Sequence, residues 1–310
     1  MNYRKLDRNL IIIIAAGVGV FLLILIGVLY FNYTNGMNYK LSKLGYKKAD
    51  ITVIMKNLSD SELKIVLENN YMKELAGILK DDFYMDENFE RYIAFASEIG
   101  EDASNVVALV NTNNDKAFYE DVEETDTSKG KLMLVNKHYG LTSSYVPEDL
   151  VTVGSAYAYQ GISLSQEAYT GVISMFKAAK NAGYTLIIDT GYRSYQKQQD
   201  AYDFWLNKED EEYADEVAAH AGHSEHQTGL AINIQVLPNN YDSFDSTNAF
   251  DWLINNAHKY GFILRYPEGK EAITGFKYED SHFRFVGSEV ATEIKDLNIT
   301  FDEYYAFNIK

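Results

Sequence analysis

The amino-acid sequence predicts an α+β domain over residues 132–310, because segments with the periodicity of strands and of helices follow one another there. Residues 184–189 (YTLIID) form an apolar run typical of a buried strand, and residues 230–236 (LAINIQV) alternate apolar and polar side chains. Residues 132–135 (LMLV) predict a third, short strand. Apolar residues at helical spacing follow Ser165 and precede Gly261, so each marks one end of a predicted helix.

Composition narrows the class of protein before any motif is considered. The 310 residues carry a formal net charge of −17, which repels the phosphate backbone of nucleic acid and excludes it as a partner. Hydrophobic residues make up 46% of the chain, enough for a real core. The chain has no Cys, which excludes thiolate metal sites and leaves His, Asp and Glu as the available ligands.

The N-terminal part predicts a membrane anchor. Residues 10–31 (LIIIIAAGVGVFLLILIGVLYF) carry no charge and are long enough as a helix to cross the hydrocarbon core of a bilayer, about 30 Å thick. With the interfacial Tyr33, the predicted anchor covers residues 10–33, behind a cytoplasmic tail of residues 1–9. Basic residues flank both ends of this span, so their distribution does not decide its orientation. The short tail and the large acidic C-terminal part favour the tail inside and the bulk of the chain outside the cell membrane.

Two segments separate the anchor from the α+β domain. Residues 38–118 predict a helical spacer, since Ser59 and Glu62 have the spacing of a capping box ahead of an apolar pattern. Residues 119–131 (YEDVEETDTSKGK) are acidic and rich in Thr, Ser and Gly, which predicts a solvated linker.

Two motifs in the domain carry chemistry. Residues 224–233 read SEHQTGLAIN, and residues 278–287 read YEDSHFRFVG. They resemble the VanY-like D-alanyl-D-alanine carboxypeptidases, a zinc-peptidase family with the pattern SxHxxGxAxD followed by ExWHxR. The resemblance extends through residues 134–137 (LVNK), 191–195 (GYRSY) and 260–267 (YGFILRYP), and covers roughly residues 130–290.

The resemblance implies a fold, a cofactor, a substrate and a set of site residues. The fold is a compact zinc-peptidase domain with a small antiparallel sheet and flanking helices, and the substrates are the peptide stems of peptidoglycan. One zinc ion is held by His226, Asn233 and His282, and Glu279 is the general base. Arg193 binds and polarises the substrate, while Ser224 and Gln198 line the pocket that holds it.

The sequence departs from the family pattern at the metal. The third ligand of the family is Asp, where this chain has Asn233, and Ser281 replaces the Trp before the second His. An amide oxygen offers a metal no charge, so the sequence predicts weaker zinc binding. Two hypotheses follow: a working zinc carboxypeptidase that removes the terminal D-Ala, and a catalytically impaired pseudoenzyme that binds cell-wall peptides as a sensor or scaffold.

Overall fold

The computed structural model describes residues 8–310, with side chains from Gly17 onward. The chain divides into two compact units, Met1–Val107 and Ala108–Lys310, and each is described by itself. Most of the tail expected over residues 1–9 lies outside the described residues.

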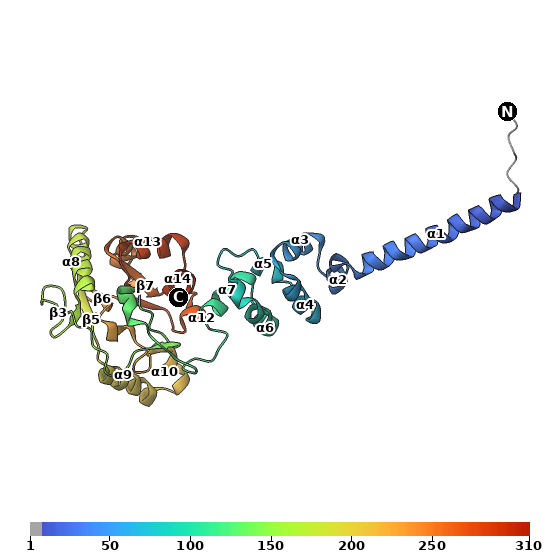
Figure 1. Ribbon diagram of the computed structural model, residues 1–310. Helices are drawn as coiled ribbons and strands as arrows, with labels where there is room; N and C mark the ends of the chain where they lie inside the picture. Colours follow the sequence, from blue (N-terminus) through green and yellow to red (C-terminus); the bar gives the residue numbers. More distant parts are fainter. Residues whose placement is uncertain (1–7) are drawn as a thin grey trace. The chain divides into compact units, whose positions relative to one another are not determined.

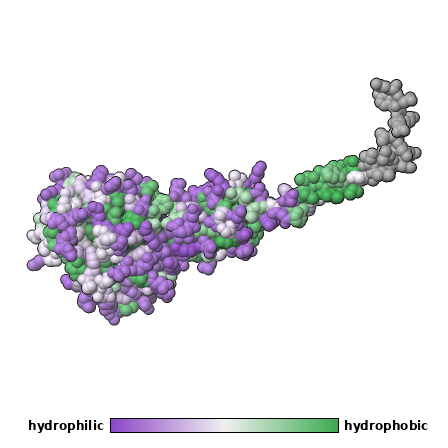
Figure 2. All heavy atoms as spheres, viewed as in Figure 1, coloured by the Kyte–Doolittle hydropathy of each residue, from purple (hydrophilic) through white to green (hydrophobic). Residues whose placement is uncertain are grey.

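Unit 1 begins with one long helix, α1 (Arg8–Asn35). Within it, Gly17–Asn35 is long and apolar enough to cross a membrane, and none of this segment is buried against other parts of the protein. Apolar atoms cover its described surface (Figure 2). By length and composition, α1 is therefore a candidate membrane span.

The rest of unit 1 consists of short helices. Ser59 caps α4 in the predicted capping box, with its side chain on the backbone of Glu62 and the Glu62 carboxylate on the backbone N–H of Ser59. Leu41, Ile54 and Leu75 are fully buried in the apolar contacts of these helices. The helices are α2 (Met37–Leu44), α3 (Lys48–Asn57), α4 (Asp60–Glu68), α5 (Leu75–Ile78), η1 (Asp86–Asn88), α6 (Phe89–Ile99) and α7 (Ala103–Asn111), which crosses into unit 2.

Unit 2 is built on a four-stranded antiparallel sheet, which confirms the α+β prediction and its two main strands. The strand order is β5-β6-β8-β7. The strands are β5 (Thr185–Thr190), β6 (Ala231–Leu237), β7 (Phe262–Tyr266) and β8 (Glu279–Phe285). β6 and β8 pair so that Asn233 lies directly opposite His282.

Alternation along the strands gives the sheet one apolar and one polar face. Ile232, Ile234, Phe283 and Phe262 belong to the main apolar core. Side chains one position away point to the other face, which therefore receives the residues Asn233, His282, Arg265 and Arg284. The strand period thus collects polar groups from three strands on one side of the sheet.

Helices cover the apolar face and frame the polar one. The predicted helix after Ser165 is α8 (Gln166–Asn181), which runs alongside β5 (Figure 1) and buries Val172, Met175 and Phe176. The predicted helix before Gly261 is α11 (Asn248–Asn256), continued by η5 (Ala257–Tyr260). The remaining helices are α9 (Tyr195–Lys208), α10 (Glu211–Val217), η3 (Glu225–Thr228), η4 (Phe244–Ser246), α12 (Glu271–Thr274), α13 (Ser288–Leu297) and α14 (Phe301–Asn308).

The segment before the sheet differs from the sequence prediction. Residues 119–131, expected to be a solvated linker, contain β1 (Glu123–Glu124), which pairs in parallel with β2 (Tyr139–Gly140), and most of η2 (Thr127–Leu132). The strand predicted over residues 132–135 is wrong, because Met133 and Val135 are buried in the core without pairing to another strand. A second small ladder joins β3 (Leu150–Thr152) to β4 (Ser163–Ser165).

Candidate active site

A tight turn positions the first histidine. Ser224 caps the short helix η3, with its side-chain oxygen accepting from the backbone N–H of His226, and Gly229 ends the turn in the left-handed conformation. His226 is buried, and its Nδ1 lies 2.9 Å from the carbonyl oxygen of Gly191. A carbonyl only accepts, so Nδ1 carries the ring proton and the lone pair of the neutral ring is on Nε2.

The second histidine reaches the same place from β8. The ring centroids of His226 and His282 are 4.8 Å apart. His282 Nδ1 lies 3.4 Å from Glu279 Oε2. Asn233 donates from Nδ2 to Glu279 Oε1 at 2.5 Å and to Ser281 Oγ at 3.0 Å. The two imidazoles, the amide and the carboxylate therefore form one cluster.

The charges around this cluster hold the imidazole of His226 neutral and the carboxylate of Glu279 ionised. Burial lowers the pKa of His226 well below its ordinary value, and the nearby Arg193 and His282 lower it further. Burial by itself would raise the pKa of Glu279, but His282, Asn233 and Arg193 bring it below its ordinary value. A neutral imidazole beside an ionised carboxylate is the state in which the first binds a metal and the second accepts a proton.

Arg193 is tied to the same turn. Its backbone N–H donates to the carbonyl oxygen of His226 at 3.0 Å, and its guanidinium donates to Gln198 Oε1 at 2.9 Å. Gln198 in turn donates to the carbonyl oxygen of Ala219 at 2.7 Å. Burial lowers the pKa of Arg193 and Glu279 opposes that shift, so the guanidinium remains a cation.

All seven site residues predicted from the sequence border one pocket of about 380 Å³. They are Arg193, Gln198, Ser224, His226, Asn233, Glu279 and His282. Sequence reasoning missed Tyr266, whose ring packs edge-on against His282 with centroids 4.8 Å apart, and the ion pair between Lys277 and Glu216 on the pocket wall. Tyr266 stands inside the YGFILRYP segment, so its place beside the motif residues was the available signal.

The donor atoms of the cluster fit a zinc ion in kind but not in charge. His226 offers Nε2, and Asn233 borders the same pocket with an amide oxygen as its possible ligand atom. Two imidazole nitrogens and one oxygen are a ligand set that catalytic zinc accepts. Within residues 8–310, however, no three His, Cys, Asp or Glu side chains form a metal-binding group. Asn233 stands where a carboxylate would complete one.

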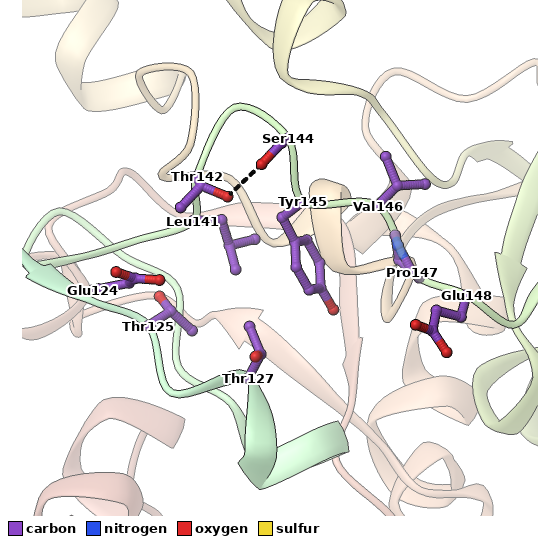
Figure 3. A pocket seen from close by; sticks show the side chains of 10 residues that line it. All are labelled: Glu124, Thr125, Thr127, Leu141, Thr142, Ser144, Tyr145, Val146, Pro147 and Glu148. Carbon is purple, nitrogen blue, oxygen red and sulfur yellow. Dashed lines mark hydrogen bonds between the residues drawn. The ribbon is translucent and has the colours of Figure 1, made fainter.

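A second, larger cavity lies elsewhere in unit 2. Its volume is about 560 Å³, and Figure 3 shows Tyr145 in its middle with Glu124 and Glu148 toward opposite ends. Hydroxyl groups of Thr125, Thr127 and Ser144 complete the polar lining. None of its lining residues is a histidine or a cation, whereas the smaller pocket is lined by both.

Comparison with known proteins identifies the family to which the chain belongs. The sequence model of the family described as VanY, D-alanyl-D-alanine carboxypeptidase, matches residues 161–288. A putative carboxypeptidase, YodJ of Bacillus subtilis, is 39% identical over 199 residues, which cover 62% of this chain and 73% of that protein. The bifunctional D-Ala-D-Ala dipeptidase and carboxypeptidase VanXYC of Enterococcus gallinarum is 31% identical, covering 57% of this chain and 94% of the relative.

Solved structures agree with this assignment. The LD-carboxypeptidase LdcB matches with a TM-score of 0.57 and 38% identity, over 61% of this chain and 91% of that one. VanYB, solved with D-alanine-D-alanine, matches with a TM-score of 0.52 and 29% identity, over 57% of this chain and 98% of that one. The chain belongs to the VanY D-alanyl-D-alanine carboxypeptidase family.

Proposed function

We propose that this protein is a membrane-anchored carboxypeptidase that hydrolyses the terminal D-Ala peptide bond of peptidoglycan stem peptides. The observation that carries the proposal is the convergence of Arg193, Glu279, His226 and His282 on one pocket of about 380 Å³ in a chain of the VanY family. Solved relatives include VanYB with D-alanine-D-alanine and a VanY D,D-pentapeptidase with Zn(II).

Each residue has a task that its chemistry suits. Arg193 presents a forked cation that pairs with the carboxylate at the end of the peptide or with the oxygen that becomes negative during hydrolysis. Gln198 holds that guanidinium at 2.9 Å and so limits its freedom. Glu279 is ionised and takes the proton of the attacking water, then returns it to the leaving amine.

The proposed cofactor is one zinc ion, with His226, Asn233 and His282 as its ligands. When bound, zinc supplies a Lewis acid that lowers the pKa of water toward about 7. Asn233 leaves the ion a full double charge, so we expect weaker binding than with an aspartate ligand. We further propose that α1 spans the cell membrane and that the domain faces outward, since the substrate lies outside the membrane.

One observation favours the pseudoenzyme as a second candidate. The amide nitrogen of Asn233 donates to Glu279 at 2.5 Å, which occupies an oxygen that a general base needs free. In that case the pocket binds stem peptides through Arg193 without cleaving them, and the protein serves as a sensor or scaffold.

The test uses the full chain in detergent micelles and a stem pentapeptide ending in D-Ala-D-Ala. We expect bound zinc near one equivalent, release of D-Ala, and loss of release with a chelator or in Glu279→Gln. Wild type that releases nothing at saturating zinc, beside an active Asn233→Asp variant, would contradict the enzyme and support the pseudoenzyme. A stem tetrapeptide assayed in parallel separates L,D- from D,D-specificity.

A further inference from the structure

A dense cluster of buried charges lies behind the site. Glu225 and Arg265 have fully buried side chains, and Arg265 Nε donates to Glu225 Oε1 at 2.7 Å. Arg284 Nη1 approaches the same oxygen to 2.9 Å. Arg265 also donates to both carboxylate oxygens of Asp302, at 2.6 and 3.1 Å. Two carboxylates and two guanidiniums balance, so the cluster has no net charge of its own.

One oxygen of this cluster is left over. Glu225 Oε1 accepts a hydrogen bond from Arg265 and forms an ion pair with Arg284, whereas Oε2 is buried and makes no hydrogen bond to any residue that the structure describes. The atom opposite it is His282 Nε2, at 3.9 Å, which is also buried and without a partner in the described part of the chain. A buried polar atom without a hydrogen bond is costly, so a hydrogen bond between these two atoms stabilises the folded chain.

A second carboxylate competes for the same ring. A neutral imidazole carries one proton, and His282 stands between Glu225 at Nε2 and Glu279 at Nδ1. Glu279 accepts from Asn233 through its other oxygen, Oε1, and its side chain is 40% exposed, so water can also reach this carboxylate. Glu225 is 0% exposed, and its Oε2 receives no hydrogen bond from any side chain in the described part of the chain, so its need for the proton is the greater.

We propose that Glu225 is a positioning residue for His282: its Oε2 accepts the Nε2–H of the ring and thereby leaves the Nδ1 lone pair facing the pocket. This inference rests on the proposed function, in which His282 binds a metal through that lone pair. Arg265 and Asp302 keep the carboxylate from rotating, and Asn136 anchors Asp302 with a hydrogen bond of 2.8 Å. Asp302 and Asn136 both lie outside the segment 161–288 that matches the family.

Replacing Glu225 by glutamine is expected to move the ring proton of His282 from Nε2 to Nδ1. In Glu225→Gln, the side-chain amide keeps one oxygen, and this oxygen faces Arg265 and Arg284 because guanidinium groups only donate hydrogen bonds. The amide N–H then points at His282 Nε2, which accepts, and the ring proton moves to Nδ1, where it donates to Glu279. The lone pair leaves the pocket without any change in the size of the side chain at position 225.

The tautomer is read from long-range ¹H–¹⁵N spectra of the full chain without metal, in detergent micelles with labelled histidine. The chain has six histidines, and His282→Gln assigns the signal. We expect protonated Nε2 in wild type and protonated Nδ1 in Glu225→Gln. Asp302→Asn is the matched control, because it removes the same charge from the same cluster but does not contact His282, and it retains the wild-type tautomer.

Zinc affinity by competition titration is the second readout. We expect Glu225→Gln to bind about 10- to 100-fold more weakly, and Asp302→Asn to stay within about threefold of wild type. If Glu225→Gln does not fold, Glu225→Asp keeps the charge but shortens the reach, and the wild-type tautomer is again expected to be lost.

Protonated Nδ1 in wild type, or equal changes in Glu225→Gln and Asp302→Asn, would overturn the proposal. The tautomer is measured without metal, peptide or turnover, so failure of the proposed hydrolysis leaves this result intact, and the reverse also holds.

Discussion

The two sides of the His226–His282 pair differ in how their polar groups are held. The pocket side contains Asn233 and the partly exposed Glu279, which are held by a few hydrogen bonds and border open space. The other side contains Glu225 and Arg265, fully buried and bound to further charges. We therefore expect substitutions on the pocket side to cost little stability, whereas substitutions on the buried side should cost much more.

The buried side should show the largest effect. Replacing Arg265 by Met leaves Glu225 and Asp302 without their shared cation, and the free energy of unfolding is expected to fall by about 3–5 kcal/mol. Urea unfolding followed by circular dichroism measures it. Arg193→Met on the pocket side is the control and should cost less than about 1 kcal/mol. Equal losses in the two variants would erase the distinction between the sides.

On the pocket side, Asn233→Asp should change binding instead. A carboxylate beside the two imidazoles is expected to raise zinc affinity about 100-fold, or about 2.7 kcal/mol. Without zinc the variant should be less stable than wild type, because the hydrogen bond to Glu279 becomes a repulsion. Competition titration with a zinc chelator gives the affinity. Asn255→Asp adds the same charge at an exposed position and should leave it unchanged.

Acid should weaken the buried side through His138. Its backbone N–H donates to Asn136, which holds Asp302, and burial lowers the pKa of its imidazole. Below about pH 6.5, His138 is protonated in the unfolded chain but stays neutral in the folded chain. Its contribution to the free energy of unfolding is therefore fully present above that pH and is lost as the pH falls further.

The slope is expected to be about 1.4 kcal/mol per pH unit for this one histidine. Urea unfolding at pH 7.5 and pH 5.5 measures it, and His138→Gln should reduce the slope by that amount, leaving the contributions of the other histidines with lowered pKa values, such as His226. If that variant keeps the wild-type pH dependence, His138 does not contribute to the loss of stability in acid.

The smallest effect concerns the guanidinium of the pocket side. Gln198→Met keeps the volume but removes the hydrogen bonds to Arg193 and to the carbonyl of Ala219. We expect KM for a stem peptide to rise about fivefold, or about 1 kcal/mol, with kcat nearly unchanged. A fall in kcat alone would indicate that Gln198 acts on the reaction itself rather than on the position of Arg193.

Local patterns explain how much of the fold was predictable. The alternation in residues 230–236 and the apolar run 184–189 correspond to β6 and β5, and Ser59 caps α4 as predicted. Ser165 occupies the N-cap position of α8 but makes no capping hydrogen bond with its side chain. Residues 119–131 are largely exposed to solvent, as their acidic, small side chains indicate, but composition did not reveal that β1 pairs in parallel with β2, which follows it in the chain. Backbone pairing of that kind leaves no trace in composition.

Sequence patterns were enough to predict the apolar α1, the strands β5 and β6, the helices α8 and α11, and the residue types that border the pocket, because periodicity and motif spacing are local properties. The contacts of Glu225 with Arg265 and His282, and of Arg265 with Asp302, became visible in the folded structure alone. Glu225 and Arg265 are 40 positions apart, and Arg265 and Asp302 are 37. Their contact depends on strand register and on the packing of α14, which bring together charges that no short stretch of sequence relates.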